Sequence, residues 1–358
     1  KIPCRTMPVA RNRSSFATVT TFIICCLSPG GRNFVRGSHG LRSGLALASA
    51  RDEQEENKRH RTSPAFLASP RAHACAASSS AAFCSSTPDR EIRMLPENSG
   101  RVVHIATAVD STQDECRALV RSRAPDAVGA VAVTATRQTG GRGTNGRKWI
   151  GRSGNLFLTV AVPINAVPVT PTLLPLKVGV IVASNVRRVL LESSLNERSK
   201  VTLKWPNDVL IDDKKIAGVL IENEYQKNYN DGWFLIGIGV NVASAPEIPN
   251  VGEERGRPAT CLGDHMEGGL DEGSLLRFGE SIAGDISTWI FKTVDEKEAE
   301  SAKILEEWRG FANFGKPLKI RDGPSNEMVI PLDIESDGRL RVLGDNGKER
   351  LLAADYLL

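Results

Sequence analysis

The 358-residue chain has no acidic residue before Asp52 and no pair of cysteines with the C-x-x-C spacing. Without such a pair, neither a zinc knuckle nor a dithiol redox motif is supported. No apolar run reaches the roughly 20 residues that a membrane-spanning helix needs, so no membrane role is expected. The net charge of +4 is modest, and its excess lies largely near the N-terminus. A nucleic-acid partner would need basic residues clustered on one face, and none is expected.

The first 95 residues differ in composition from the rest of the chain. Arg, Ser and Ala abound, acids are scarce, and five of the seven cysteines fall there. Such a segment cannot bury enough apolar surface to fold, so we expect residues 1–95 to be a disordered leader. An arginine-rich, acid-poor leader is typical of a transit peptide. This predicts a plastid or mitochondrial protein, or a cytoplasmic one if translation starts at Met94; the alternative is an extension foreign to the working protein.

From residue 96 the hydrophobic pattern predicts an α/β (α+β) domain over 96–312 and a small β-barrel of SH3-like size over 313–358. Asp110-Ser111-Thr112 is expected to cap a helix that runs to Arg121. Further helices are expected at 175–191, 274–292 and 296–309. A turn at Asp212-Asp213 should close a hairpin. Strands are expected at 102–106, 128–136, 156–162, 201–204, 209–211, 216–221 and 233–242, and in the second domain at 317–320, 328–334, 339–343 and 349–353.

Residues 137–149 form a glycine-rich loop loaded with cations. Its spacing Gly141-x-Gly143-x-x-Gly146 matches the dinucleotide fingerprint, but a strand is expected next, and no acid that could hold a ribose follows within 40 residues. A phosphate-binding P-loop would continue with Lys-Ser/Thr, and a kinase loop would require His-Arg-Asp and Asp-Phe-Gly triplets, all of which are missing. What remains is a nest of backbone N–H groups for an anion, to which Arg142 and Arg147 add charge-assisted hydrogen bonds.

A second motif runs from Lys204-Trp-Pro-Asn-Asp208 to Lys215-Ile-Ala-Gly-Val-Leu-Ile-Glu222. It places Lys215 just after a tight turn and beside a carboxylate. The two motifs together predict a pocket that holds phosphate next to a second ionised ligand. His104 and His265 are the histidines outside the leader, and neither is given a catalytic role.

These motifs resemble those of the biotin protein ligases (holocarboxylase synthetases), and they follow one another along the chain in the same order as in that family. The second motif resembles the family's active-site core, and the glycine loop resembles its biotin- and nucleotide-binding loop. Residues 110–113 look like its Ser-Thr-Asn biotin element, 237–241 like a late strand, and the tail like its C-terminal domain. The likeness covers about the last 260 residues and implies a class II aminoacyl-tRNA synthetase-like mixed sheet. Nothing in residues 1–95 resembles the helix-turn-helix of the repressor-type members, so no operator binding is predicted.

The resemblance implies an ATP-dependent ligase that forms a C–N bond in two steps. The biotin carboxylate attacks the α-phosphorus of ATP, giving biotinyl-5′-adenylate and pyrophosphate. A lysine on a carrier domain of acetyl-CoA carboxylase or a related carboxylase then takes the acyl group. Because a carboxylate is ionised near neutrality, the first step needs no general base. Holding the two anions together can contribute about 7–11 kcal/mol, provided that cations cancel their repulsion. Mg²⁺ is expected to arrive with ATP, since no side-chain motif for a metal is present.

The resemblance also implies residue roles. The catalytic residues would be Lys215, Arg142 and Asp208. Asp208 is predicted to orient the acceptor lysine, whose reference pKa is about 10.4, and to draw off its proton. Biotin would be bound by Ser111, Thr112, Gln113, Gln138, Arg142, Gly143, Thr144, Lys215 and Gly218. The nucleotide would be bound by Gly141, Arg142, Gly143, Arg147, Trp149, Asn207, Lys215 and Asn241.

Two residues depart from the family pattern. Thr144 stands where the family usually has an arginine that helps to hold the adenylate, so a leakier adenylate is expected. Gln113 replaces the more typical asparagine. Two alternatives stay open: a lipoate or octanoate ligase of the same superfold, and a catalytically impaired biotin-binding protein. A homodimer is compatible with the sequence, which does not fix the oligomeric state or the carboxylase that is modified.

Overall fold

The computed structural model describes residues 89–95, 99–122, 129–144, 146–193, 199–228, 231–247, 258–292, 297–320 and 327–354. All of them belong to one compact unit, Ala77–Leu358. Residues 1–88, and with them most of the expected leader, lie outside the described residues.

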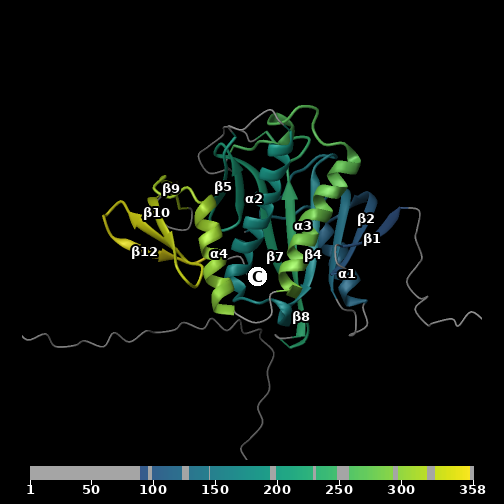
Figure 1. Cartoon of the computed structure of the whole chain (residues 1–358), viewed down its shortest axis with the longest axis horizontal. Helices are drawn as coiled ribbons and strands as arrows, with labels where there is room; N and C mark the ends of the chain where they lie inside the picture. Colours follow the sequence, from purple (N-terminus) through teal and green to yellow (C-terminus); the bar gives the residue numbers. More distant parts are fainter. Residues whose placement is uncertain are drawn as a thin grey trace, which may run out of the picture. The chain divides into compact units, whose positions relative to one another are not determined.

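An eight-stranded mixed sheet forms the larger part of this unit (Figure 1). Its order is β1-β2-β3-β4-β8-β7-β6-β5, and β2 pairs with β3 in parallel while the other neighbours pair antiparallel. The strands are β1 (Arg90–Met94), β2 (Gly100–Val109), β3 (Ala130–Gln138), β4 (Leu156–Pro163), β5 (Val201–Lys204), β6 (Asp208–Ile211), β7 (Lys214–Asn228) and β8 (Asp231–Val240).

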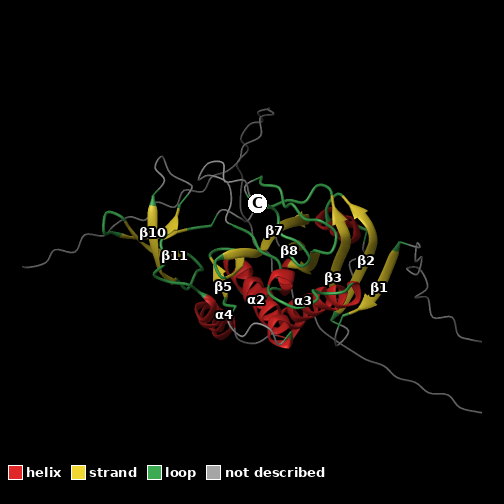
Figure 2. Ribbon diagram, turned by 90° about the horizontal axis from the view of Figure 1, so that it is seen from above, coloured by secondary structure: helices red, strands yellow, loops and turns green. Residues whose placement is uncertain are grey.

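Side chains alternate across this sheet and make two buried clusters. On β3, Ala130 and Ala132 join the larger cluster, which packs against α2 (Leu174–Glu192), α3 (Glu272–Lys292) and α4 (Lys297–Phe311). Val131 and Val133 join the smaller cluster, which packs against α1 (Thr112–Arg121) through its Cys116 and Val120. Figure 2 shows α2, α3 and α4 together on one side of the strands. The expected mixed α/β fold is therefore confirmed. None of the helices within the described ranges combines the length and the apolar character needed to cross a membrane.

Local chemistry explains why the elements begin and turn where they do. Ser111 caps α1 by accepting a hydrogen bond from the Gln113 backbone N–H, and acids follow in the first turn, as the sequence predicts. Asp212 and Asp213 have φ values of 47° and 67°, the left-handed pair that a two-residue hairpin turn requires. This turn joins β6 to β7 and places Lys215 at the second position of β7.

Two expectations need correction. Residues 90–94 were predicted to be part of a disordered leader, but they form β1, which pairs with β2 at the sheet edge. The alternation of charged and apolar residues in this segment is weak, so the sequence does not mark it as a strand. Its pairing with β2 holds it in the sheet. The strand predicted at 216–221 is also longer in the structure, where β7 runs over Lys214–Asn228. Residues 222–228 are mostly polar, so no apolar alternation marks them, yet they continue the strand by backbone pairing.

The C-terminal strands form a separate four-stranded sheet of the size expected for an SH3-like domain. Its order is β12-β11-β10-β9, with β9 at Leu318–Lys319, β10 at Met328–Ile334, β11 at Leu340–Gly344 and β12 at Glu349–Leu352. Buried side chains of β10 and β11 belong to the same cluster as α2, α3 and α4. The Trp205 indole Nε1 donates to the Gly338 carbonyl at 3.0 Å, which ties the β5–β6 turn to the turn between β10 and β11.

Candidate active site

The parallel pairing of β2 with β3 brings the first predicted ligand element to the glycine loop. Val109 and Gln138 are register partners, so the segments that follow both strands leave the same sheet edge. Gln138 Oε1 accepts hydrogen bonds from Thr112 N at 2.8 Å and from Thr112 Oγ1 at 3.0 Å. Thr112 Oγ1 also lies 2.9 Å from Thr159 Oγ1. Thr112 and Gln138, predicted separately from the sequence, are thus hydrogen-bonded to each other, and Ser111 precedes Thr112 as the cap of α1.

Gln113 is buried against β8. Its Nε2 donates to the Leu235 carbonyl at 3.4 Å. A Cβ placed on Gly237 would lie 2.9 Å from Gln113 Cδ, closer than real Cβ contacts allow. Glycine at 237 therefore makes room for the longer glutamine that replaces the family's asparagine.

The glycine loop closes on itself. Trp149 N donates to Gly141 O at 2.9 Å, Gly143 N donates to Arg147 O at 2.7 Å, and Arg142 and Lys148 form an antiparallel bridge. This corrects the expectation of a simple anion nest, because the N–H groups of Gly143 and Trp149 point at carbonyls of the loop itself. The hairpin-like closure instead fixes the backbone position from which the Trp149 side chain departs.

The Trp149 ring lies over a floor of two glycines. A Cβ on Gly239 would lie 2.3 Å from Trp149 Cε2, and a Cβ on Gly218 would lie 3.2 Å from Trp149 Cζ3 and 3.1 Å from Lys215 Nζ. Lys215 Nζ is 5.4 Å from the centroid of the Trp149 ring, within cation–π range. The Trp149 indole N–H is buried and has no hydrogen-bond acceptor among the described residues. An acceptor for this N–H would have to come from an ordered water or a bound ligand.

Lys215 is paired with Asp208 across the β6–β7 hairpin. Lys215 Nζ lies 2.5 Å from Asp208 Oδ1, and Lys204 Nζ lies 3.9 Å from Asp208 Oδ2. The Lys215 side chain is 25% exposed, so the ammonium is not sealed inside the protein. The lysine just past the turn, Lys215, therefore lies beside the carboxylate of Asp208, as the sequence predicts.

The two asparagines of the predicted nucleotide site brace the backbone. Asn207 Nδ2 donates to Val219 O at 2.7 Å, and Val219 N donates to Asn207 O at 3.0 Å. Asn241 Nδ2 donates to Thr260 O at 3.1 Å, while its Oδ1 is buried without a partner among the described residues.

Residues 258–260 form a part of the site that sequence reasoning missed. Lys215 N donates to Pro258 O at 2.8 Å, and Thr260 N donates to Lys215 O at 3.0 Å. The segment follows a polar stretch and has no motif of its own, so no signal in the sequence marks it. Its backbone fixes the position from which the Lys215 side chain departs.

Arg142 faces carboxylates rather than open space. Its Nη1 lies 2.6 Å from Asp114 Oδ2, and its Nε lies 3.1 Å from Glu222 Oε1. The hydrogen bond from Arg142 holds the pKa of the Asp114 carboxyl below its usual value, and the same bond raises the pKa of Arg142. The charge expected to meet phosphate is thus paired in this structure, and contact between Arg142 and phosphate stays a prediction.

Further arginines and acids surround this pair. We call the whole set the arginine–carboxylate cluster: Asp114, Arg117, Arg121, Arg142, Glu222 and Glu224. Sequence reasoning did not select its members from α1 and β7. A signal exists in retrospect, because helix spacing puts 114, 117 and 121 on one face of α1, and 222 and 224 share one face of β7.

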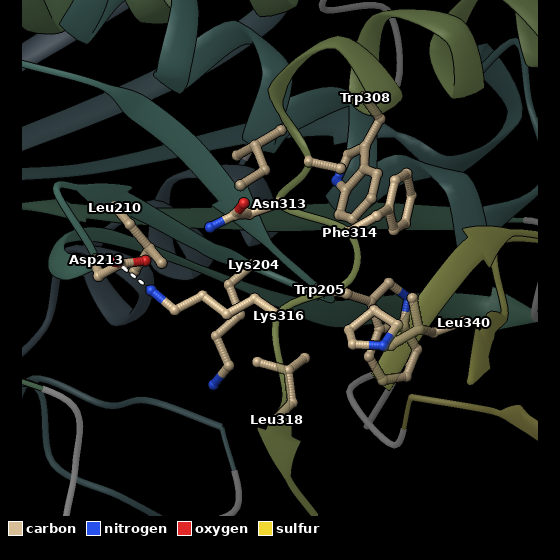
Figure 3. A pocket seen from close by; sticks show the side chains of 13 residues that line it. Lys204, Trp205, Leu210, Asp213, Trp308, Asn313, Phe314, Lys316, Leu318 and Leu340 are labelled. Atoms are coloured by element: carbon tan, nitrogen blue, oxygen red, sulfur yellow. Dashed lines mark hydrogen bonds and ion pairs between the residues drawn. The ribbon is translucent and has the colours of Figure 1, made fainter. Parts of the chain in front are cut away.

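A separate groove lies between the β5–β6 hairpin, the end of α4 and the C-terminal sheet (Figure 3). It spans about 400 Å³, part of which is open to solvent, and is walled mainly by aromatic and aliphatic side chains, among them Trp205, Trp308, Phe314 and Leu340. Lys316 and Asp213 pair at one side of it. No residue of the glycine loop lines this groove. Lys215 pairs with Asp208 beside the Trp149 ring instead, and we take this region as the candidate active site.

The chain is also similar to known proteins. A sequence model of the Biotin/lipoate A/B protein ligase family matches residues 106–241, which include the glycine loop and Lys215. The biotin–[acetyl-CoA-carboxylase] ligase of Mycobacterium tuberculosis is 33% identical over 226 residues, which cover 62% of this chain and 76% of that protein. The bifunctional ligase/repressor BirA of Escherichia coli is 30% identical over 251 residues, which cover 69% and 71% of the two chains.

A solved structure, the biotin protein ligase from Aquifex aeolicus in complex with biotin and ATP, has the same fold. Its TM-score is 0.51 at 24% identity, over 71% of this chain and 96% of that chain. Fold and matched segment together define a protein ligase of the biotin/lipoate type. Within that class, the chain belongs to the biotin protein ligase family.

Proposed function

We propose that this protein is an ATP-dependent biotin protein ligase, which makes biotinyl-5′-adenylate and transfers biotin to a lysine of a carrier domain. The observation that carries the proposal is the meeting of Lys215, Asp208 and Trp149 over the glycine floor of β7 and β8. The Mycobacterium tuberculosis relative is a biotin–[acetyl-CoA-carboxylase] ligase, which favours biotin over lipoate or octanoate as substrate.

Biotin has a polar bicyclic head, an apolar tail and a terminal carboxylate, and the site offers a match for each. The hydrogen-bonded pair of Thr112 and Gln138, with the neighbouring Ser111 and Gln113, supplies donors and acceptors for the head, and we propose the backbone of Gly143 and Thr144 as further contacts. Trp149 and the bare backbone of Gly218 supply an apolar wall. Lys215 stands at the far end for the carboxylate.

In the first step Lys215 acts as the bridging cation. Its ammonium neutralises the biotin carboxylate and the α-phosphate while the carboxylate oxygen attacks phosphorus and pyrophosphate leaves. Arg147, Gly141, Asn207 and Asn241 are the further nucleotide contacts that we propose. The described residues contain no group of three or more His, Cys, Asp or Glu side chains that could hold a metal ion. Mg²⁺ would enter with ATP and would help to neutralise the charge of its phosphates.

Intact mass of an acceptor protein tests this function directly. The enzyme is incubated with ATP, Mg²⁺, biotin and the carrier domain of an acetyl-CoA carboxylase, and the carrier should gain the mass of one biotinyl group. A parallel incubation with lipoate should leave the carrier unchanged. Biotin-dependent pyrophosphate release separates an active ligase from a biotin-binding protein without catalysis, and the absence of both signals would reject the proposal.

Asp208 is proposed to serve the second step. Its carboxylate, already 2.5 Å from Lys215 Nζ, can orient the incoming acceptor lysine and take its proton. In Asp208→Asn the amide oxygen still accepts a hydrogen bond from Lys215, but it no longer acts as a base. We expect adenylate formation to fall only a few-fold and transfer to slow by roughly a hundredfold. Separate single-turnover assays of the two half-reactions check this, and equal losses in both would refute the division of labour.

Thr144 is proposed to weaken retention of the adenylate. In this structure Arg147 Nε donates to the Thr144 carbonyl at 3.0 Å, and the short threonine side chain offers no positive charge. Restoring the family's residue by Thr144→Arg adds charge-assisted donors, so the release of free biotinyl-adenylate should slow by about tenfold. Release is measured by chasing preformed adenylate complex with excess unlabelled adenylate. Equal release rates in the two proteins would show that Thr144 has no such effect.

We further propose that the arginine-rich leader directs the protein to a plastid or mitochondrion. The support is its composition alone. Microscopy of a fluorescent protein fused to residues 1–95 tests the proposal, and diffuse cytoplasmic signal would reject it.

A further inference from the structure

Arg142 donates hydrogen bonds to two acids that come from different elements, α1 and β7. Asp114 on α1 accepts hydrogen bonds from Arg142 Nη1 at 2.6 Å and from Nη2 at 2.9 Å. Glu222 on β7 accepts from Nε at 3.1 Å and from Nη2 at 3.3 Å. A guanidinium has five N–H donors, so these four bonds leave little for any other partner. The side chain thus ties the glycine loop to both α1 and β7.

Arg117 supports this arrangement, because it forms ion pairs with the same two acids, Asp114 and Glu222. Its Nη1 lies 2.6 Å from Asp114, its Nη2 lies 2.5 Å from Glu222, and its Nε lies 3.1 Å from Glu224. The side chains of Arg117, Glu222 and Glu224 are no more than 20% exposed. Ion pairs that are partly removed from water and share partners in a network hold geometry better than isolated surface pairs.

The position of the loop sets the shape of the proposed site. Trp149 closes the loop through its hydrogen bond to Gly141 and lies against the glycine floor beside Lys215. Gly143, next to Arg142 in sequence, is one of the proposed biotin contacts. A loop that swings away would therefore remove the apolar wall and open a path for bound ligand to leave.

We propose that Asp114, Glu222 and Arg117 form a clamp that holds the glycine loop closed through Arg142 and so sets how long biotin and its adenylate stay bound. They are positioning residues, since they act through the loop and do not touch the reacting atoms. The identity of the ligand rests on the proposed function, whereas the closure of the loop rests on the contacts of Arg142 alone.

The first test measures the loop without any ligand. Amide hydrogen exchange of residues 141–149 is followed in the full chain, in Asp114→Asn and in Glu222→Gln. Each variant should exchange about tenfold faster at Gly143 and Trp149, because the local opening equilibrium shifts. Asp114→Glu, which keeps the carboxylate, should restore much of the protection. Unchanged exchange in both neutral variants would overturn the clamp, whether or not the protein is a ligase.

The matched control is Glu280→Gln. Glu280 is another partly buried acid, 3.0 Å from Arg93 and 2.9 Å from His104, and it contacts no residue of the arginine–carboxylate cluster. This variant should leave exchange in the loop at the wild-type rate. A loop that opens equally in Glu280→Gln would mean that general destabilisation, not the clamp, explains the effect, and would also overturn the proposal.

The second test measures ligand residence. Biotinyl-adenylate should dissociate about tenfold faster from Asp114→Asn and Glu222→Gln, and KM for biotin should rise more than kcat falls. Slower dissociation would mean that the acids compete with the ligand for Arg142, which contradicts the clamp. A wild-type protein without ligase activity would remove the proposed function but leave the exchange result standing.

Discussion

Replacing Lys215 by alanine is expected to lower biotin-dependent ATP–pyrophosphate exchange by about a thousandfold. Lys215 is the cation that stands between the proposed carboxylate and α-phosphate positions, and its loss leaves two like charges to approach unscreened. The fold should survive, because the backbone bonds of residue 215 to Pro258 and Thr260 do not involve the side chain. The measurement is incorporation of labelled pyrophosphate into ATP at saturating biotin.

Lys214→Ala is the matched control for this experiment. Lys214 precedes Lys215 in the same strand, and its side chain is exposed. Removing it changes the net charge by the same amount and should leave exchange within about twofold of wild type. If Lys215→Ala kept more than about a tenth of the wild-type rate, the bridging role would be abandoned. An equal loss in Lys214→Ala would point to overall charge instead.

Adding one methyl group at Gly239 is the second change with a large expected effect. The new Cβ would lie 2.3 Å from Trp149 Cε2 and 2.6 Å from Cζ2 and Nε1, so the ring must move. Trp149 is held at its backbone by Gly141, which limits how it can adjust. Overpacking of this kind costs about 1–3 kcal/mol, which corresponds to roughly a ten- to hundredfold weaker affinity for biotin. Calorimetric titration of Gly239→Ala with biotin gives that affinity.

Gly310→Ala is the control for the Gly239 substitution. Gly310 lies in α4, and a Cβ there would meet nothing within 4 Å. Alanine favours the helix by up to about 1 kcal/mol, so this variant should be at least as stable as wild type and should bind biotin equally well. Wild-type affinity in Gly239→Ala would show that the Trp149 ring does not form a wall of the biotin site.

The sequence was a good guide wherever the information is local. A few neighbouring residues predict the cap at Ser111 and the turn at Asp212-Asp213, and the structure has both. The predicted strands also follow one another along the chain as expected. The approach of Lys215 to Asp208 also follows, because both belong to one hairpin.

Contacts between distant segments were beyond such reasoning. Arg142 meets Glu222 across 80 positions of sequence, and Arg117 meets it across 105. Each of these charged residues alone is ordinary for a solvent-facing position, and only the pairing of β7 with β8 and the packing of α1 bring them together. The same holds for the Trp149 ring and Gly239, whose fit depends on how a loop folds back over a strand. The motifs therefore predicted candidate residues for the site, whereas the contacts of these residues with distant segments are visible only in the structure.

The indole of Trp205 has a consequence for how the two sheets behave. It stands three residues before Asp208 and is anchored to the Gly338 carbonyl in the distant β10–β11 turn. A displacement of the β10–β11 turn would therefore shift the start of β6, where Asp208 lies. The C-terminal region thus braces the hairpin that carries Asp208 at two points, through the Trp205 indole and through the ion pair of Lys316 with Asp213.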